Sequence, residues 1–225
     1  VIRNDLAKEG IEHRFRELNE LACELAREAR RRAGREDVLI AGAMPPLRGS
    51  FRADLVGEYD EIFPLYQEQA PILAPHVDLI LCETMSSALE GKAAATAACA
   101  TGRPVWVAWT LHDNKLGVLR SGESLGEAYA AIAELPVCGY LANCCPPESI
   151  ESAMPELAAM PGRFIGGYAN TFMPIPQEWT LDGSGESDGL LAVRDDLDPQ
   201  AYAELAGRWL SLGANVIGGC CGTSP

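Results

Sequence analysis

The sequence predicts an α/β fold with a parallel sheet, and three observations support this. Six short apolar runs alternate with helical stretches along the 225 residues. The runs are continuously apolar, as expected for parallel strands covered on both faces. Polar residues follow the runs, where the sites of α/β barrels and open α/β sheets lie. Because strand–helix units cross over right-handedly, the sheet is expected either to close into a barrel or to remain open.

The first expected element is a helix over about residues 5–33, which Gly34 ends. Apolar residues recur there at intervals of four and three, which draws one stripe down a helix. The members of this stripe are Ile11, Phe15, Leu18, Ala22, Leu25 and Ala29. The six strands are expected over residues 37–43, 77–83, 104–110, 139–144, 163–170 and 214–220.

Polar groups at the ends of these strands mark the expected site. They are Met44-Pro45-Pro46, Glu83-Thr84, His112-Asp113, Asn143-Cys144, Asn170-Thr171 and Cys220-Cys221. No G-x-G-x-x-G motif follows a strand and no Walker lysine occurs, so a phosphate loop is not expected. The connection over residues 170–198 has prolines and no periodicity, and loops of that length are usually lids, binding loops or disordered. We expect a mobile flap beside the site.

Composition excludes several classes of partner. The formal net charge of −14 argues against binding to nucleic acid or to an anionic membrane, which require clustered Lys and Arg. No apolar run approaches the roughly 20 residues that span a bilayer, and the first residues carry no signal-peptide core. We therefore predict a soluble, cytoplasmic protein with one domain over residues 1–225. The sequence leaves the oligomeric state open.

Eight cysteines are expected to be reduced thiols, since the chain is far longer than a small disulfide scaffold and two of the pairs are sequence neighbours. Four of them are expected to pack as small hydrophobes: Cys23, Cys82, Cys99 and Cys138. The three histidines show no paired spacing, so a histidine-based metal site is not expected. His13 is expected on a solvated helix face.

The adjacent cysteines at two strand ends suggest a metal site. Three thiolates would make a zinc site that keeps one position open. Neighbouring residues on an extended strand point to opposite faces, so Cys220 and Cys221 reach one ion only if the backbone turns. Gly218, Gly219 and Gly222 allow such a turn. The alternatives for this pair are two small buried hydrophobes or a vicinal disulfide, and for residues 144–145 alone packing is favoured.

A three-thiolate zinc ion favours one kind of chemistry. A substrate thiol, with a free pKa of about 8.5, loses its proton when it enters the open position. Four thiolates around a dication leave excess negative charge, which keeps the bound sulfur nucleophilic. The implied reaction is the alkylation of a thiol.

Three motifs resemble the homocysteine S-methyltransferase family, a zinc-dependent group that includes betaine-homocysteine and S-methylmethionine-homocysteine methyltransferases and the homocysteine module of cobalamin-dependent methionine synthase. They are DLILCETM (78–85), NC (143–144) and GGCCGT (218–223), in the family's order. The resemblance spans essentially the whole chain. It implies a (β/α)8 TIM-type barrel in which the six strands are the third to eighth. The first strands and the last helix are absent from this chain, so we expect truncation at both ends.

The resemblance also implies roles for site residues. Cys144, Cys220 and Cys221 would be the zinc ligands, with homocysteine sulfur as the fourth, and Cys145 is treated as spare. Glu83 would accept the amino group of homocysteine, with Thr84 beside it and Asn143 shaping the mouth of the site. The alternative for Glu83 is a carboxylate at the rim that pairs with a basic side chain. The alternative for Asn143 and Asn170 is capping of the strand ends.

The expected reaction transfers a methyl group from a small-molecule donor to the thiol of homocysteine and gives methionine. The donor stays open, because Trp109 and the YANTF run (168–172) depart from the family near the donor pocket. A cationic donor would favour an aromatic face within about 6 Å. The candidates, each also explained by ordinary packing, are Trp109, Tyr168, Phe172 and Trp179.

Two rival functions remain. One is a non-catalytic zinc-binding barrel in which the protein itself fills the fourth position. The other is an enzyme with a bare cysteine nucleophile, which needs a histidine base, and His112 is the only histidine at a strand end. One zinc per chain with three protected thiols would favour a zinc-binding function. A protein without zinc and with one hyper-reactive thiol would favour the cysteine-nucleophile enzyme.

Overall fold

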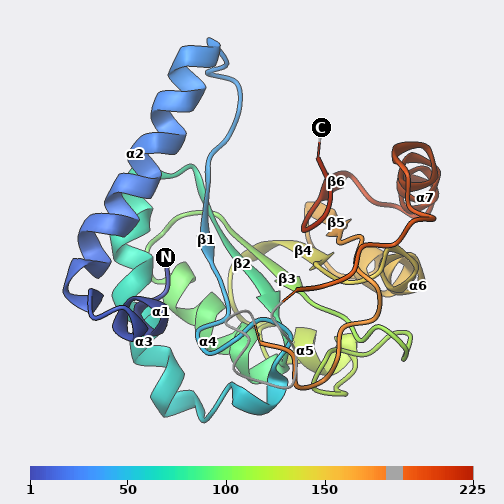
Figure 1. Cartoon of the computed structure of the whole chain (residues 1–225), viewed down its shortest axis with the longest axis horizontal. Coiled ribbons are helices and arrows are strands. Elements are labelled where there is room, and N and C mark those ends of the chain that lie inside the picture. The colour runs from blue at the N-terminus through green and yellow to red at the C-terminus, as the bar shows by residue number, and fades with distance from the viewer. Residues whose placement is uncertain (181–189, 225) are drawn as a thin grey trace.

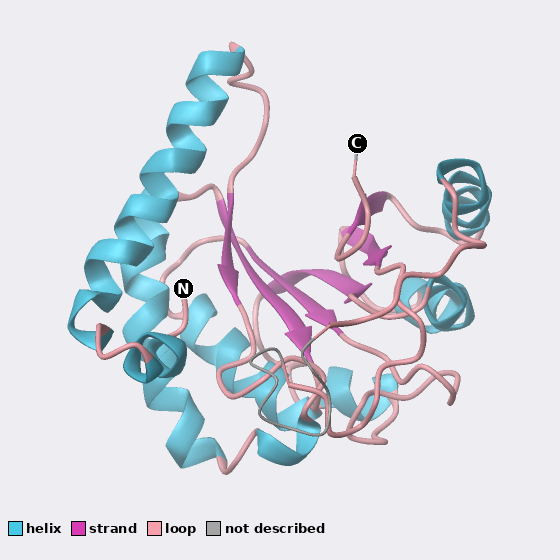
Figure 2. Cartoon of the chain, viewed as in Figure 1, coloured by secondary structure: helices cyan, strands magenta, loops and turns pink. Residues whose placement is uncertain are grey.

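The computed structural model describes residues 1–180 and 190–224 as a curled parallel sheet with helices along its outer side (Figures 1 and 2). The strands follow chain order, β1-β2-β3-β4-β5-β6, and all neighbours are parallel. Within the described residues no strand pairs with the free edge of β1 or β6, so the sheet is a half-barrel. This confirms the predicted α/β fold and its parallel strands, whereas closure into a barrel stays a prediction.

The elements have the following bounds. The strands are β1 (Ala41–Met44), β2 (Leu79–Met85), β3 (Val105–Trp109), β4 (Val137–Asn143), β5 (Phe164–Ala169) and β6 (Val216–Gly219). The α-helices are α1 (Arg3–Lys8), α2 (Phe15–Ala33), α3 (Tyr59–Leu73), α4 (Ala88–Cys99), α5 (Leu125–Ala130), α6 (Pro147–Ala158) and α7 (Pro199–Ser211). Short 3-10 helices span Glu12–Arg14, Ala53–Leu55 and Ala74–His76.

The predicted first helix is wrong in two respects. It is broken into α1 and α2, because Gly10 adopts φ +68° and ends the first segment. Its apolar stripe is only partly packed: Phe15 is buried, but Leu25 is 63% exposed. The buried face of α2 runs through Phe15, Asn19 and Cys23 instead. Figure 1 shows the reason, since the second half of α2 rises past the end of the sheet.

The two faces of the sheet have different roles. On β2, Ile80 and Cys82 are fully buried on the helix side, whereas Leu81 and Glu83 alternate with them toward the inside of the curl. In the parallel register Leu81 pairs with Trp106 on β3, so Trp106 also faces the inside of the curl. Trp109 therefore belongs to the helix side, where it is fully buried and stacks on Tyr140. This contradicts its place among the aromatic residues predicted to face a donor.

The helix-side core confirms part of the cysteine prediction, because Cys23 and Cys82 are buried there among apolar side chains. Cys99 and Cys138 are half-buried. None of the helices within residues 1–180 and 190–224 combines the length and apolar character needed to cross a bilayer. The cytoplasmic location stays a prediction.

The predicted flap is described only at its two stems, residues 171–180 and 190–198. The stems pair with each other: the Met173 amide donates to the Ala192 carbonyl (2.8 Å), and the Arg194 amide donates to the Thr171 carbonyl (2.8 Å). The segment between them, residues 181–189, lies outside the described residues, so the predicted mobility stays untested. The stems bring this long connection next to the carboxyl ends of the strands.

Candidate metal and substrate site

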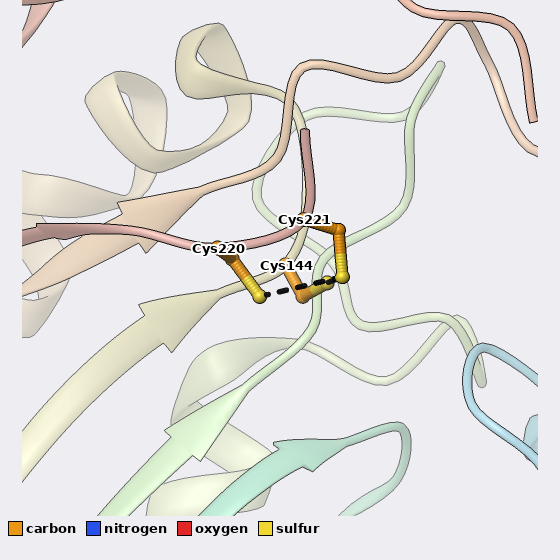
Figure 3. Close-up of side chains that lie close together, drawn as sticks. All are labelled: Cys144, Cys220 and Cys221. Atoms are coloured by element: carbon orange, nitrogen blue, oxygen red, sulfur yellow. Dashed lines mark hydrogen bonds between the residues drawn. The ribbon is translucent and has the colours of Figure 1, made fainter. Parts of the chain in front are cut away.

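Three thiols meet at the carboxyl ends of β4 and β6 (Figure 3). The sulfur of Cys221 lies 3.8 Å from that of Cys144 and 3.9 Å from that of Cys220, and all three lie within 4.8 Å of one another. Tetrahedral bonds of about 2.3 Å to zinc would hold three sulfurs about 3.8 Å apart. The donor set thus fits such an ion, and it is the only group of this kind among the described residues. The cluster could hold a metal.

Cys144 reaches this cluster because the backbone turns at the end of β4. Its φ is +50°, a left-handed conformation that is uncommon outside glycine. The amide of Cys144 donates to the Tyr168 carbonyl (3.0 Å). Its carbonyl accepts from the side chains of Asn170 (2.9 Å) and Thr110 (3.2 Å). These bonds from neighbouring strand ends hold the turn in place.

Cys145 lies on the other side of this turn. It is fully buried and belongs to the main core cluster, whereas Cys144 belongs to a second cluster at the strand ends. Burial raises the pKa of the Cys145 thiol to about 12. The structure therefore brings Cys144, not Cys145, together with Cys220 and Cys221.

The adjacent cysteines after β6 both reach the cluster through a tight turn. The Thr223 amide donates to the Cys220 carbonyl (3.2 Å), which closes a four-residue turn. Gly222 takes its third position at φ +78°, where a side chain is strained. A Cβ at Gly222 would also overlap the Thr171 hydroxyl. The turn places the sulfur of Cys221 on the same side as that of Cys220. The glycines around this pair led us to expect such a turn.

The thiols polarise one another. Cys221 accepts hydrogen bonds from Cys144 and Cys220, and these lower its pKa. The pKa of Cys144 is raised, first by its hydrogen bonds with Cys220 and Cys221 and then by burial. Cys221 is the exposed member of the cluster, whereas Cys144 is buried.

Glu83 lies on the inward side of β2 near these thiols. The Tyr168 hydroxyl, from β5, donates to Glu83 Oε2 over 3.0 Å. Burial raises the pKa of the Glu83 carboxyl, the bond from Tyr168 opposes that change, and Cys221 adds to it. A half-buried carboxylate of this kind can accept a hydrogen bond from a cationic ligand.

Thr84 and Asn143 hold each other beside Glu83. The Thr84 amide donates to Asn143 Oδ1 (2.7 Å), and Asn143 Nδ2 donates to the Thr84 hydroxyl (2.8 Å). Thr84 has φ +62°, which is strained for a β-branched residue and needs such support. Both were predicted to bind substrate. The structure places them against each other, where they fix the backbone that follows Glu83.

An ion pair that the sequence analysis missed contacts the first flap stem. Arg120 and Asp113 are both nearly buried and form two hydrogen bonds, one of 3.0 Å from Arg120 Nη1 to Asp113 Oδ2. The same oxygen accepts from the Ile175 amide in the first flap stem (2.7 Å). Asp113 stood out as a polar residue at a strand end, but no motif marks Arg120.

Two aromatic side chains, Phe51 and Trp179, pack beside the Arg120–Asp113 ion pair. The guanidinium of Arg120 lies 4.9 Å from the centre of the Phe51 ring, and that ring packs on Trp179 at 5.6 Å. Trp179 and Cys144 share the second cluster, and Phe172 packs against it. The flap stem is thereby attached beside the thiols.

Comparisons with known proteins identify the family of this chain. The model of the homocysteine S-methyltransferase family matches residues 1–225. Homocysteine S-methyltransferase 4 of Zea mays is 28% identical over 93% of this chain and 65% of its own length. Selenocysteine Se-methyltransferase of Brassica oleracea var. italica is 29% identical over 84% of this chain and 55% of its own length. The chain therefore spans less than two thirds of these curated relatives.

A solved structure shares the fold. The metallated form of the homocysteine methyltransferase MmuM from Escherichia coli superposes with a TM-score of 0.76 at 24% identity. The match covers 100% of this chain and 73% of that one. The half-barrel is thus similar to a large part of a longer fold.

Proposed function

This chain belongs to the homocysteine S-methyltransferase family, and we propose that the protein transfers a methyl group from a small-molecule donor to the thiol of homocysteine, giving methionine. The observation that carries the proposal is the cluster of three thiols at the strand ends. It lies close enough to Glu83 for Cys221 to influence the pKa of that carboxyl. A thiol site and an amino-group site are therefore neighbours.

The proposed metal is zinc, held by Cys144, Cys220 and Cys221. The sulfur separations and the all-thiol donor set support it, because zinc takes three protein ligands in catalytic sites and accepts thiolates. When bound, zinc would lower the pKa of a thiol in its open position and so supply a thiolate at neutral pH.

The chain's own residues would orient the substrate. Glu83 would accept a hydrogen bond from the ammonium group of homocysteine, while Asn143 and Thr84 keep the backbone that follows Glu83 in place. The thiol gives up its proton, its sulfur lone pair forms the new bond to the methyl carbon, and the donor leaves with the electron pair of the broken bond. Holding both reactants in this geometry is the chain's main contribution to the rate.

Two of the predicted aromatic residues remain candidates for a cationic donor. Phe172 and Trp179 lie at the second cluster beside Cys144. Tyr168 is engaged with Glu83, and Trp109 is in the core. We propose that the complete protein closes the half-barrel into a (β/α)8 barrel around this site.

The cysteine-nucleophile alternative has less support. It needs a histidine within hydrogen-bond reach of a thiol. The ring nitrogen Nδ1 of His112 instead accepts from the Asn114 amide (3.0 Å), and among the described residues no hydrogen bond links His112 to a thiol.

The test is methyl transfer by the full-length, zinc-loaded protein. Homocysteine would be offered with S-methylmethionine, betaine or a methylfolate, each carrying a deuterated methyl group, and labelled methionine would be detected by mass spectrometry. We expect product with one of these donors, and none from Cys144→Ala. A zinc-loaded protein that makes no labelled methionine with any donor would instead support the non-catalytic zinc barrel.

A further inference from the structure

The contact between Tyr168 and Glu83 joins two strands that are not neighbours. Glu83 lies on β2 and Tyr168 on β5, with β3 and β4 between them, so the hydrogen bond of 3.0 Å crosses the inside of the curled sheet. It is the one hydrogen bond to this carboxylate between described residues. Because the phenol contacts Oε2, the oxygen Oε1 is left for a second donor.

The position of Tyr168 is set by its strand. In the register of the sheet it lies between Asn143 on β4 and Gly218 on β6. A Cβ at Gly218 would lie 3.3 Å from the Cβ of Tyr168, so the absence of a side chain there gives the tyrosine room. The carbonyl of Tyr168 also accepts from the Cys144 amide (3.0 Å). One residue thus contacts Cys144 through its backbone and Glu83 through its side chain.

These two contacts match the two ends of an amino-acid thiol. The sulfur of homocysteine would approach the cluster that includes Cys144, and its ammonium group would approach Glu83. An ammonium group needs an ionised carboxylate, and a hydrogen bond from a phenol favours the ionised form of a half-buried carboxyl. The hydroxyl of Tyr168 also limits the rotation of the Glu83 side chain. The hydroxyl is therefore placed to aid binding of an amino group without touching it.

We propose that Tyr168 is a positioning residue that orients Glu83 and so makes the site prefer thiols carrying an α-amino group over simple thiols. The inference rests on the proposed function, since it needs homocysteine at this site. Tyr168→Phe is the informative change, because it keeps the ring and the backbone contact to Cys144 and removes only the hydroxyl.

The experiment measures binding to the full-length, zinc-loaded protein by calorimetry. The two ligands are homocysteine and its des-amino analogue, mercaptobutanoate. A hydrogen bond to a charged group predicts that Tyr168→Phe weakens homocysteine binding about tenfold or more. Mercaptobutanoate should bind both proteins equally. Zinc content should be the same in both.

A matched control is Tyr202→Phe. The Tyr202 hydroxyl lies nearby on the helix side, where it donates to the Gly218 carbonyl (2.7 Å) and accepts from the Ala169 amide (2.9 Å). Its loss should leave the preference for homocysteine over mercaptobutanoate unchanged. A second variant, Glu83→Gln, should remove most of that preference, and adding Tyr168→Phe to it should have no further effect.

The outcomes separate the two proposals. Suppose that the wild type binds homocysteine, but Tyr168→Phe weakens the binding of both ligands equally or leaves both affinities unchanged. The role of Tyr168 is then overturned and the proposed function stands. An additive effect in the double variant would overturn it as well, even if Tyr168→Phe alone were poorly folded. A wild type that binds neither thiol would overturn both.

Discussion

Cys144–Cys145 and Cys220–Cys221 are both adjacent cysteines at the carboxyl end of a parallel strand, yet they contribute differently. Only Cys144 of the first pair joins the thiol cluster, while Cys145 is fully buried in the helix-side core. Both members of the second pair join it. Cysteine spacing is identical in the two pairs, so the backbone after each strand decides which sulfur faces the site.

The two backbones differ in where the left-handed residue lies. In the first pair it is a cysteine itself, Cys144 at φ +50°, so the two thiols diverge. In the second pair it is Gly222, the residue that follows Cys221, so both cysteines precede the bend and converge. A metal site could therefore be predicted from the motif, but its ligands depend on turn geometry.

The largest expected effect comes from removing single thiols. Cys144→Ala or Cys221→Ala should reduce bound zinc from about one ion per chain to nearly none after dialysis against a chelator, since three ligands are needed. Cys145→Ala is the matched control and should keep its zinc. Metal analysis checks this.

The reverse pattern, with zinc lost from Cys145→Ala and kept in Cys144→Ala, would show that the first pair uses its other thiol. The comparison between the pairs would then fail.

A smaller effect is expected from Gly222→Ala. An alanine at a left-handed position costs about 1 kcal/mol of unfolding free energy, and here its Cβ would also overlap the Thr171 hydroxyl. The turn that aligns Cys220 with Cys221 should shift, and zinc affinity should fall roughly tenfold. Competition with a chromophoric chelator measures this.

Gly102→Ala provides the control, because Gly102 has φ +74° but no atom within 4 Å of an added Cβ. Gly102→Ala should lower the free energy of unfolding in urea by a similar amount, and its zinc affinity should stay unchanged. Equal zinc affinities in the two variants would argue against a role for the turn.

Cys145→Ala should instead act on stability alone. Removing a buried sulfur leaves a small cavity, for which we expect a loss of about 1 kcal/mol in urea unfolding. The loss should be the same with and without chelator. For Cys144→Ala, by contrast, adding chelator should change nothing, because the metal's contribution is already gone. A chelator-dependent loss in Cys145→Ala would contradict the assignment.

The finest distinction concerns alkylation of the metal-free, reduced protein. Cys221 is exposed and Cys145 is fully buried with its pKa raised to about 12. Iodoacetamide should therefore label Cys221 well before Cys145, as peptide mass spectrometry would show. Labelling of Cys145 should accelerate as the pH rises toward 12, because its thiolate fraction grows. Early labelling of Cys145 at neutral pH would place it outside the core.

The sequence predicted the existence and order of the six strands, because continuous apolar runs and chain-order crossovers leave few arrangements. The first strand was misplaced: it spans Ala41–Met44 rather than residues 37–43, and Val38 and Leu39 are exposed. It could not tell which face of a strand Trp109 occupies, since a strand covered on both sides is apolar on both sides. It could not separate Cys144 from Cys145, because that depends on a single left-handed residue. Arg120 was missed because its partner, Asp113, becomes a neighbour only when residues 111–119 fold back on themselves.

The central claim is that three thiols of this chain hold zinc and leave one position for a substrate sulfur. Zinc-edge X-ray absorption on the full-length protein, before and after adding homocysteine, tests it most directly. We predict about three sulfur neighbours at about 2.3 Å before addition and about four afterwards. A shell dominated by nitrogen or oxygen, or one that homocysteine leaves unchanged, would contradict the claim.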